Sequence, residues 1–144
     1  MSDALRIQPF FHDDTNTWTY VVSRGPDAVL IDPVLDYDPR SGQLGSRSMD
    51  LVLADMRERG LSLHRVLETH AHADHLSGAQ VARAATGAPV GIGAGIASVQ
   101  AHFAKVFGID ADDAQLRDAF DARFADGDVI EAGELRFTVL ATPG

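Results

Sequence analysis

The chain has 144 residues and a formal net charge of −9, because 12 Lys and Arg stand against 21 Asp and Glu, and it has no cysteine. The length suits one domain rather than two, the acidity disfavours nucleic acid and anionic membranes as partners, and the lack of thiols excludes disulfides, thiolate metal ligands and a cysteine nucleophile within these residues. Hydrophobic residues make up 45% and charged residues 23%, close to average globular usage, which excludes wholesale disorder.

The first third of the chain predicts an antiparallel meander. Segments suited to strands, separated by polar turns, lie at residues 5–11, 18–23 and 28–31. Pro9 cannot donate a hydrogen bond to a strand ladder, which places the first strand at a sheet edge. Trp18 and Tyr20 alternate at strand spacing, which predicts that both pack in the core.

The remaining segments alternate between loops, helices and strands. Pro and Gly residues predict a long loop over 32–45, after which Ser48 is expected to cap a helix that Gly60 ends. A strand is expected at 63–68 and a helix at about 75–85. The later patterns predict a strand at 90–92, a helix at 97–107, a partly helical acidic stretch at 109–123 and a hairpin of 129–130 with 135–141. Strands followed by strand–helix alternation indicate a mixed α/β domain.

A cluster of histidines carries the main chemical signal. Residues 69–75 read Thr-His-Ala-His-Ala-Asp-His, directly after a predicted strand and before a helical pattern, where many α/β active sites lie. His70 and His72 are two residues apart, so an extended segment points both side chains the same way. Asp74 and His75 fall at the expected start of the helix, where they can face a neighbouring point.

The ligand types in this cluster indicate a metal site. Imidazole nitrogens with a carboxylate suit borderline divalent metals such as Zn²⁺ and Fe²⁺ better than Ca²⁺ or Mg²⁺. The alternative interpretation is a surface histidine cluster on a polar loop, but the spacing and the mixture of ligand types at a strand end favour the metal site.

The pattern Thr-His-x-His-x-Asp-His after a strand resembles the signature of the metallo-β-lactamase fold superfamily. Asp32-Pro33 at a strand end is similar to that family's first motif, whose Asp supports the metal site, and residues 140–144 resemble the segment that leads to the next ligand histidine. The resemblance implies an α/β fold, half of an αββα sandwich with a mixed sheet and flanking helices. It also implies that residues 1–144 are the N-terminal part of such a domain, before the later metal ligands.

Two stretches resemble the persulfide dioxygenase branch of this superfamily, which is close to glyoxalase II. They are Glu68 to Ala79 (ETHAHADHLSGA) and Asp32 to Pro39 (DPVLDYDP). Glyoxalase II sequences more often carry Gly-Gly after the last histidine of the motif, where this chain has Leu-Ser-Gly at 76–78. The resemblance therefore implies oxidation of glutathione persulfide with O₂ as the favoured activity, and a glyoxalase II-like thioester hydrolase with two metals as the alternative.

The resemblance assigns different ligand roles in the two branches. In the di-metal hydrolases, His70 and His72 would hold the first metal, and Asp74 and His75 the second. In the persulfide dioxygenases, two histidines and one carboxylate hold a single Fe²⁺, and only His70 of this motif would be a direct ligand. His72, Asp74 and His75 would then orient ligands or water. Asp32 would support the site from behind the ligands, and Asp74 is the residue expected to act in catalysis.

The expected cofactor is Fe²⁺, with Zn²⁺ as the alternative, and the expected substrate is a small thiol or thioester, a glutathione derivative. No apolar run approaches the roughly 20 residues that span a bilayer, and no secretory signal begins the chain, so we expect no membrane partner and a cytoplasmic location. Because the later ligands lie outside residues 1–144, we expect weak metal binding and no turnover from this chain by itself. A third interpretation is an inactive half-domain that self-associates, as a homo-oligomer, through an uncovered sheet.

Two further polar positions are weaker candidates. His12 follows the first strand at a turn that could approach the site. Asp36 and Asp38 could form paired carboxylates, although no sequence pattern places them near a substrate.

Overall fold

The computed structural model describes residues 3–110 and 112–143. Its helices are α1 (Arg47–Glu58), α2 (Ala79–Thr86), α3 (Ile96–Phe107) and α4 (Ala114–Arg117). Its strands are β1 (Arg6–His12), β2 (Thr17–Arg24), β3 (Asp27–Ile31), β4 (Val34–Asp38), β5 (Gln43–Gly45), β6 (Ser62–Glu68), β7 (Leu76–Ser77), β8 (Val90–Gly93), β9 (Ala122–Phe124), β10 (Val129–Ala132) and β11 (Leu135–Thr138). None of the helices in the described ranges is long and apolar enough to cross a membrane.

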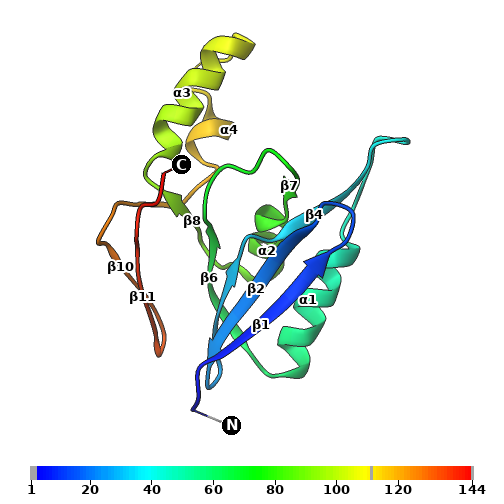
Figure 1. Cartoon of the computed structure of the whole chain (residues 1–144), viewed down its shortest axis with the longest axis vertical. Coiled ribbons are helices and arrows are strands. Elements are labelled where there is room, and N and C mark those ends of the chain that lie inside the picture. Colours follow the sequence, from blue (N-terminus) through cyan, green and yellow to red (C-terminus); the bar gives the residue numbers. More distant parts are fainter. Residues whose placement is uncertain (1–2, 111, 144) are drawn as a thin grey trace.

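A six-stranded mixed sheet in the order β1-β2-β3-β6-β8-β9 forms the centre of the molecule (Figure 1). The first three strands form the predicted antiparallel meander, with β1 at the edge as Pro9 required. From β3 onward the strands run parallel, because helices connect them. The expected mixed sheet with flanking helices is confirmed.

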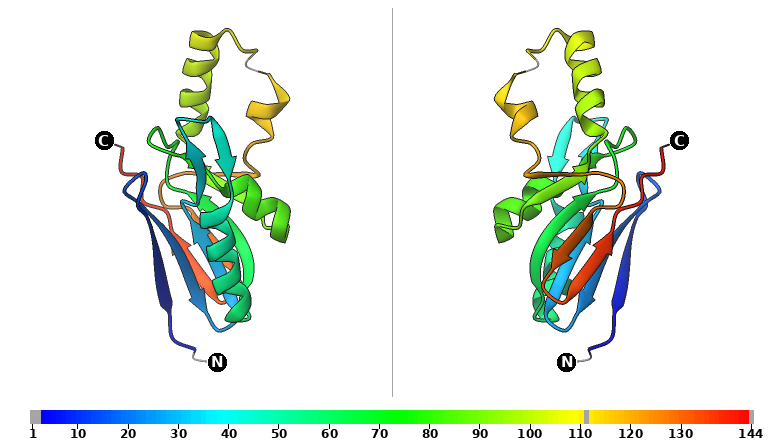
Figure 2. Two further views of the ribbon diagram at one scale, coloured as in Figure 1. Left: turned by 90° about the vertical axis from the view of Figure 1, so that its right-hand side faces the viewer. Right: turned by 90° about the vertical axis from the view of Figure 1, so that its left-hand side faces the viewer.

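One face of the sheet is covered by helices. Figure 2 shows α1 and α2 on one side of the sheet and the β10–β11 hairpin on the other, while α3 and α4 project beyond its end. The apolar stripe of α1, with Met49, Val52 and Met56 buried, packs on Leu30 and Val66 of the central strands. This cluster is the larger of the two hydrophobic cores and anchors the strands that precede the histidine motif.

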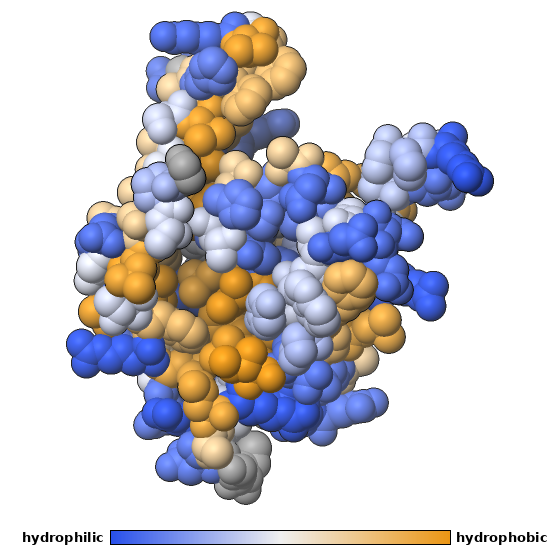
Figure 3. Space-filling view, in the orientation of Figure 1, coloured by the Kyte–Doolittle hydropathy of each residue, from blue (hydrophilic) through white to orange (hydrophobic). Residues whose placement is uncertain are grey.

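The opposite face of the sheet is only partly covered. The hairpin packs on Val22 and Val29, but β1 and the start of β2 lie beyond its reach, and Phe11 and Trp18 remain 47% and 48% exposed. Their rings contact each other with centroids 4.7 Å apart, and Figure 3 shows hydrophobic residues gathered on this side of the molecule. The prediction that Trp18 and Tyr20 pack in the core is therefore wrong, because the side of the edge strands they occupy has no covering element among the described residues.

Two predicted segments differ from the structure. The loop expected over 32–45 contains the β4–β5 hairpin, and the helix expected from His75 begins only at Ala79. The cause is one pairing: Leu76 and Ser77 form β7 against β4, so the chain stays extended after the motif. Ser48 is not the helix cap either, because its backbone N–H and hydroxyl both donate to Asp36.

Gly78 lies between β7 and α2, and its lack of a side chain lets both elements lie close to α1 and β4. A Cβ at this position would lie 2.7 Å from Met49 Sδ and 2.9 Å from the Val34 carbonyl oxygen. We expect Gly78→Ala to lower the free energy of unfolding by about 1–3 kcal/mol, because the backbone of β4 must move to admit the methyl group. Gly95→Ala is the matched control, since a Cβ there meets nothing within 4 Å. Urea denaturation measures both, and equal midpoints for the two variants would contradict the packing argument.

Candidate metal centre

The histidine motif forms a loop between β6 and β7, which we call the ligand loop (residues 69–75). It begins at the carboxyl end of β6, beside the carboxyl end of β3, because these two strands are parallel neighbours. Asp32 directly follows β3 and is tied to β6 by its backbone N–H, which donates to the Leu67 carbonyl at 2.9 Å. Its φ of +50° turns its side chain into the ligand loop, a left-handed conformation that Asp adopts more readily than most residues.

The Asp32 carboxylate organises the first half of the ligand loop. Oδ1 accepts hydrogen bonds from the Thr69 backbone N–H at 2.7 Å and from His72 Nε2 at 2.9 Å. Because Nε2 of His72 donates to Asp32, Nδ1 is the nitrogen left for a metal. That Nδ1 faces Asp74, whose Oδ1 lies 3.8 Å away.

Asp32 also orients His70, through Thr69. The Thr69 hydroxyl donates to Asp32 Oδ2 at 2.8 Å, and a carboxylate can only accept. The same hydroxyl therefore accepts from Nδ1 of His70, 2.8 Å away. This arrangement leaves the lone pair of His70 Nε2 free on an exposed ring. A single carboxylate thus selects the ring nitrogen that each of the two histidines offers.

His72 carries the strongest electrostatic perturbation in the site. Its contact with Glu68, with Nε2 and Oε2 3.2 Å apart, and its hydrogen bond to Asp32 together outweigh burial and raise its pKa from 6.5 to about 9. In the metal-free chain His72 is therefore a cation at neutral pH, and a metal at Nδ1 must displace a proton.

His75 is buried without a hydrogen bond. Its side chain is 1% exposed, and neither ring nitrogen has a hydrogen-bond partner among the described residues. Its pKa is lowered, first by burial and then by the charge of His72. Buried polar atoms are normally hydrogen-bonded, so an imidazole held in this way, with Nδ1 3.3 Å from Asp74 Oδ1, is better explained by a role in the site than by the stability of the fold.

The ligand atoms of His72, Asp74 and His75 all lie within 4.8 Å of one another. Asp74 is 54% exposed, and its pKa is lowered, first by a hydrogen bond within its own residue and also by the two nearby histidines. A second such group consists of Asp32, Glu68 and His72. In the described part of the chain His70 belongs to neither group, although its ring lies 4.2 Å from that of His72, centroid to centroid. The two imidazoles and the carboxylate of the first group suit a divalent metal, and His70 is the histidine of the motif that lies outside both groups.

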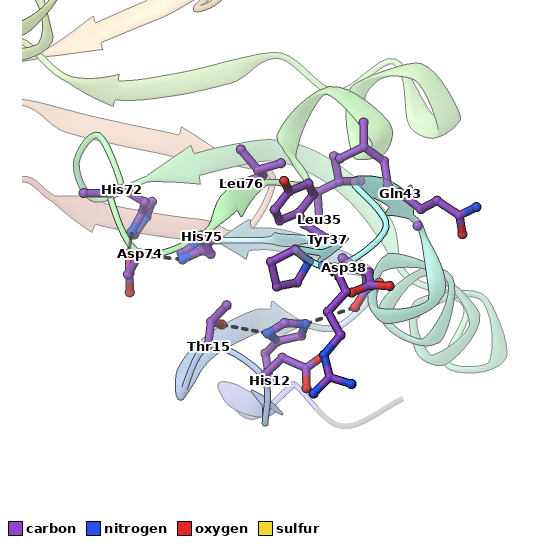
Figure 4. Close-up of a pocket in the computed structure, with 17 residues that line it drawn as sticks. His12, Thr15, Leu35, Tyr37, Asp38, Gln43, His72, Asp74, His75 and Leu76 are labelled. Atoms are coloured by element: carbon purple, nitrogen blue, oxygen red, sulfur yellow. Dashed lines mark hydrogen bonds and ion pairs between the residues drawn. The ribbon is translucent and has the colours of Figure 1, made fainter.

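A pocket of about 850 Å³ opens beside the ligand loop. Figure 4 shows His72 and Asp74 at one end of the pocket and Gln43 of the β4–β5 hairpin at the other, with His12 on one side between them. The His12 ring bridges Thr15 and Asp36, at 2.7 and 3.0 Å.

The pocket thus includes His12, Asp36 and Asp38, which the sequence singled out only weakly. They line the pocket because β4 is a strand, whereas the Pro and Gly residues of this stretch predict a loop. Burial alone would raise the pKa of Asp36, but its hydrogen bonds from Ser48 and His12 lower it. Asp36 is therefore a carboxylate that fixes His12 and the start of α1 at the pocket wall.

The perturbed histidines predict how stability depends on pH in the metal-free chain. His72, with its raised pKa, stabilises the fold below about 6.5, and that contribution is lost as the pH rises through about 9. His75, with its lowered pKa, destabilises the fold as the pH falls below its ordinary value of 6.5. We expect a stability maximum near pH 6.5 in urea melts with chelator present. His72→Gln should remove most of the decline toward pH 9, and an unchanged decline in that variant would contradict the assignment.

Comparisons with known proteins agree with this geometry. A family model described as the metallo-beta-lactamase superfamily matches residues 12–144. A beta-lactamase hydrolase-like protein of Xylella fastidiosa is 36% identical, over 96% of this chain and 32% of its own length. Glyoxylase B2 of Dictyostelium discoideum is 29% identical over 100% of this chain and 50% of its own length. Human mitochondrial persulfide dioxygenase ETHE1 is 29% identical over 97% and 44%.

A solved structure shows the same arrangement of elements. The crystal structure of ETHE1 from Myxococcus xanthus superposes with a TM-score of 0.68 and 29% identity, over 96% of this chain and 49% of the other. The chain spans between 32% and 50% of the length of the curated relatives described above.

Proposed function

The chain belongs to the metallo-beta-lactamase superfamily, and on that premise we propose that it is the N-terminal part of a metal-dependent persulfide dioxygenase that oxidises glutathione persulfide with O₂. The observation that carries the proposal is the separate position of His70. Its ring is exposed and its Nε2 has no hydrogen bond in the described part of the chain, whereas a metal at Nδ1 of His72 would have to displace a proton. This suits a mononuclear iron site to which the ligand loop contributes one direct ligand. The similarity to persulfide dioxygenases over nearly the whole chain supports the same assignment.

In this proposal the residues around His70 orient and shield rather than ligate. Fe²⁺, when bound, supplies the redox chemistry that joins O₂ to the persulfide sulfur. Asp32 holds the His70 tautomer through Thr69, and the buried ring of His75 packs against His72 in the lining of the pocket. Asp74, the exposed carboxylate of the loop, is placed to orient substrate or water, which is the catalytic role we propose for it.

The pocket beside the ligand loop has room for a small thiol. Its volume of about 850 Å³ lies within the range of sites for small ligands. Apolar side chains of Leu35 and Leu76 line it together with the guanidinium of Arg40. A glutathione derivative combines a sulfur with carboxylates, so the sulfur would lie at the end of the pocket formed by the ligand loop and a carboxylate would face Arg40.

The second candidate is a glyoxalase II-like thioester hydrolase with two metals. The grouping of His72, Asp74 and His75 favours it, because those side chains would complete a second metal site, as does the similarity to glyoxylase B2. Self-association through the open face of β1 and β2 remains a further proposal, for which the exposed Phe11 and Trp18 are the observation.

Two assays on the full-length protein separate the enzymatic candidates. The dioxygenase proposal expects oxygen uptake when iron-loaded protein meets glutathione persulfide, with no cleavage of a glutathione thioester. Thioester cleavage by zinc-loaded protein, without oxygen uptake by the iron-loaded form, would establish the hydrolase instead.

A further inference from the structure

Glu68 is a buried carboxylate for which the proposed reaction has no direct use. It is the last residue of β6, directly before the ligand loop, and its side chain is 3% exposed. A buried carboxylate is costly unless its charge and lone pairs are matched. One oxygen, Oε1, accepts a hydrogen bond from Ser77 Oγ, and the other, Oε2, lies 3.2 Å from His72 Nε2. Glu68 therefore contacts both the middle of the ligand loop and the strand that follows it.

The contact with His72 places Oε2 of Glu68 against the ring without a hydrogen bond. The one proton on His72 Nε2 is directed to Asp32 Oδ1 at 2.9 Å, so Oε2 of Glu68 has no hydrogen-bond donor in the described part of the chain. An apolar residue would fill this space without that cost. The carboxylate is thus better explained by the ring it holds than by the stability of the fold.

The ring that Glu68 contacts is the middle one of three imidazole rings that lie against one another at tilted angles. The His72 centroid lies 4.2 Å from that of His70 and 4.3 Å from that of His75. Fixing the middle ring limits the movement of both outer rings, because each of them is in contact with it. One side chain can therefore influence all three histidines of the motif.

The contact with Ser77 closes the ligand loop at its base. Ser77 pairs with Val34 in β4, and its hydroxyl also accepts from the Ala79 backbone N–H at the start of α2, at 3.0 Å. The Glu68–Ser77 hydrogen bond thus joins the end of β6 to β7, and the whole ligand loop lies on the chain between them.

We propose that Glu68 is a positioning residue for the metal centre: it holds His72 with one oxygen and Ser77 with the other, and so fixes the ligand loop in the shape that binds the metal. The inference rests on the metal site of the proposed function and applies to either metal count. Partners that orient metal ligands typically contribute 10–100-fold to metal affinity.

Titration of the full-length protein with Co²⁺, followed by visible absorption and by competition with a chelator, tests this role. We expect Glu68→Ala to bind Co²⁺ on the order of 10–100-fold more weakly and with altered absorption bands. Glu68→Gln should recover wild-type bands and most of the affinity, because its amide can donate to Ser77 while its carbonyl oxygen faces His72. Ser77→Ala should weaken binding less than Glu68→Ala, since it breaks one contact of two. Glu131→Ala, an exposed glutamate of β10, is the control.

The outcomes are distinguishable. Wild-type affinity and bands in Glu68→Ala would overturn the inference alone, and so would a Glu68→Gln variant as weak as Glu68→Ala, because charge rather than position would then be the cause. Failure of the unsubstituted full-length protein to bind Co²⁺ would overturn the proposed function and this inference with it. If thermal melting shows that Glu68→Ala does not fold, Ser77→Ala and Glu68→Gln decide, and Ser77→Ala with wild-type affinity would contradict the proposal.

Discussion

Asp32→Ala is expected to reduce metal affinity on the order of 10–100-fold and to lower the free energy of unfolding of the metal-free chain by about 2–3 kcal/mol. The substitution removes the acceptor for His72 Nε2 and for the backbone and hydroxyl of Thr69. Neither His70 nor His72 is then held in one tautomer. The substitution also places alanine at a φ of +50°, a conformation that costs alanine roughly 1 kcal/mol more than it costs aspartate. Chelator competition and urea denaturation measure the two effects.

Asp32→Asn separates the effect of the backbone conformation at residue 32 from the effect of its side-chain hydrogen bonds. Asparagine tolerates the left-handed conformation, and its carbonyl oxygen can still accept from His72, but its amide cannot accept from the Thr69 hydroxyl. We expect stability close to wild type with a clear loss of metal affinity. If Asp32→Ala binds metal as tightly as wild type, the carboxylate does not organise the ligands.

His75→Leu is expected to leave the metal-free chain at least as stable as wild type. Leucine fills a similar volume, and it removes two buried ring nitrogens that lack hydrogen bonds among the described residues, each of which costs the fold about 1–3 kcal/mol. Residues retained for function often destabilise the fold that holds them. Thermal melting with chelator present, against the exposed His102→Leu as control, measures the effect.

The metal content of His75→Leu distinguishes the two candidate enzymes. With a single iron at His70, the variant keeps its metal and loses activity through the altered pocket. With two metals, it loses one of them. A large loss of metal-free stability in His75→Leu would show instead that His75 is a structural residue.

The sequence predicted the parts of the fold that depend on local pattern. The meander, β6 and the histidine motif follow from strand spacing, turn residues and ligand types over short stretches, and the place of Asp32 followed from the family resemblance. The structure adds the reason for the place of Asp32: β3 and β6 are parallel neighbours, so the residues that follow them meet at one edge.

The parts that were missed depend on contacts between distant segments. Leu76 and Ser77 are extended because β4 pairs with them, and β4 itself lies in a stretch rich in Pro and Gly that predicts a loop. The same strand brings Asp36 to His12, 24 residues away in the sequence. Trp18 is exposed because no other element of the described residues packs on its side of β2. The sequence near Trp18 cannot predict that, since it depends on the position of distant segments.

The central claim is that His70 is the ligand that this loop contributes to a single iron. Iron content of the full-length protein, after anaerobic reconstitution and desalting, tests it most directly. We expect about one iron per wild-type chain, none in His70→Ala, and wild-type content in His102→Ala. Full iron content in His70→Ala would contradict this role. So would two metals in the wild-type protein together with one in His75→Leu.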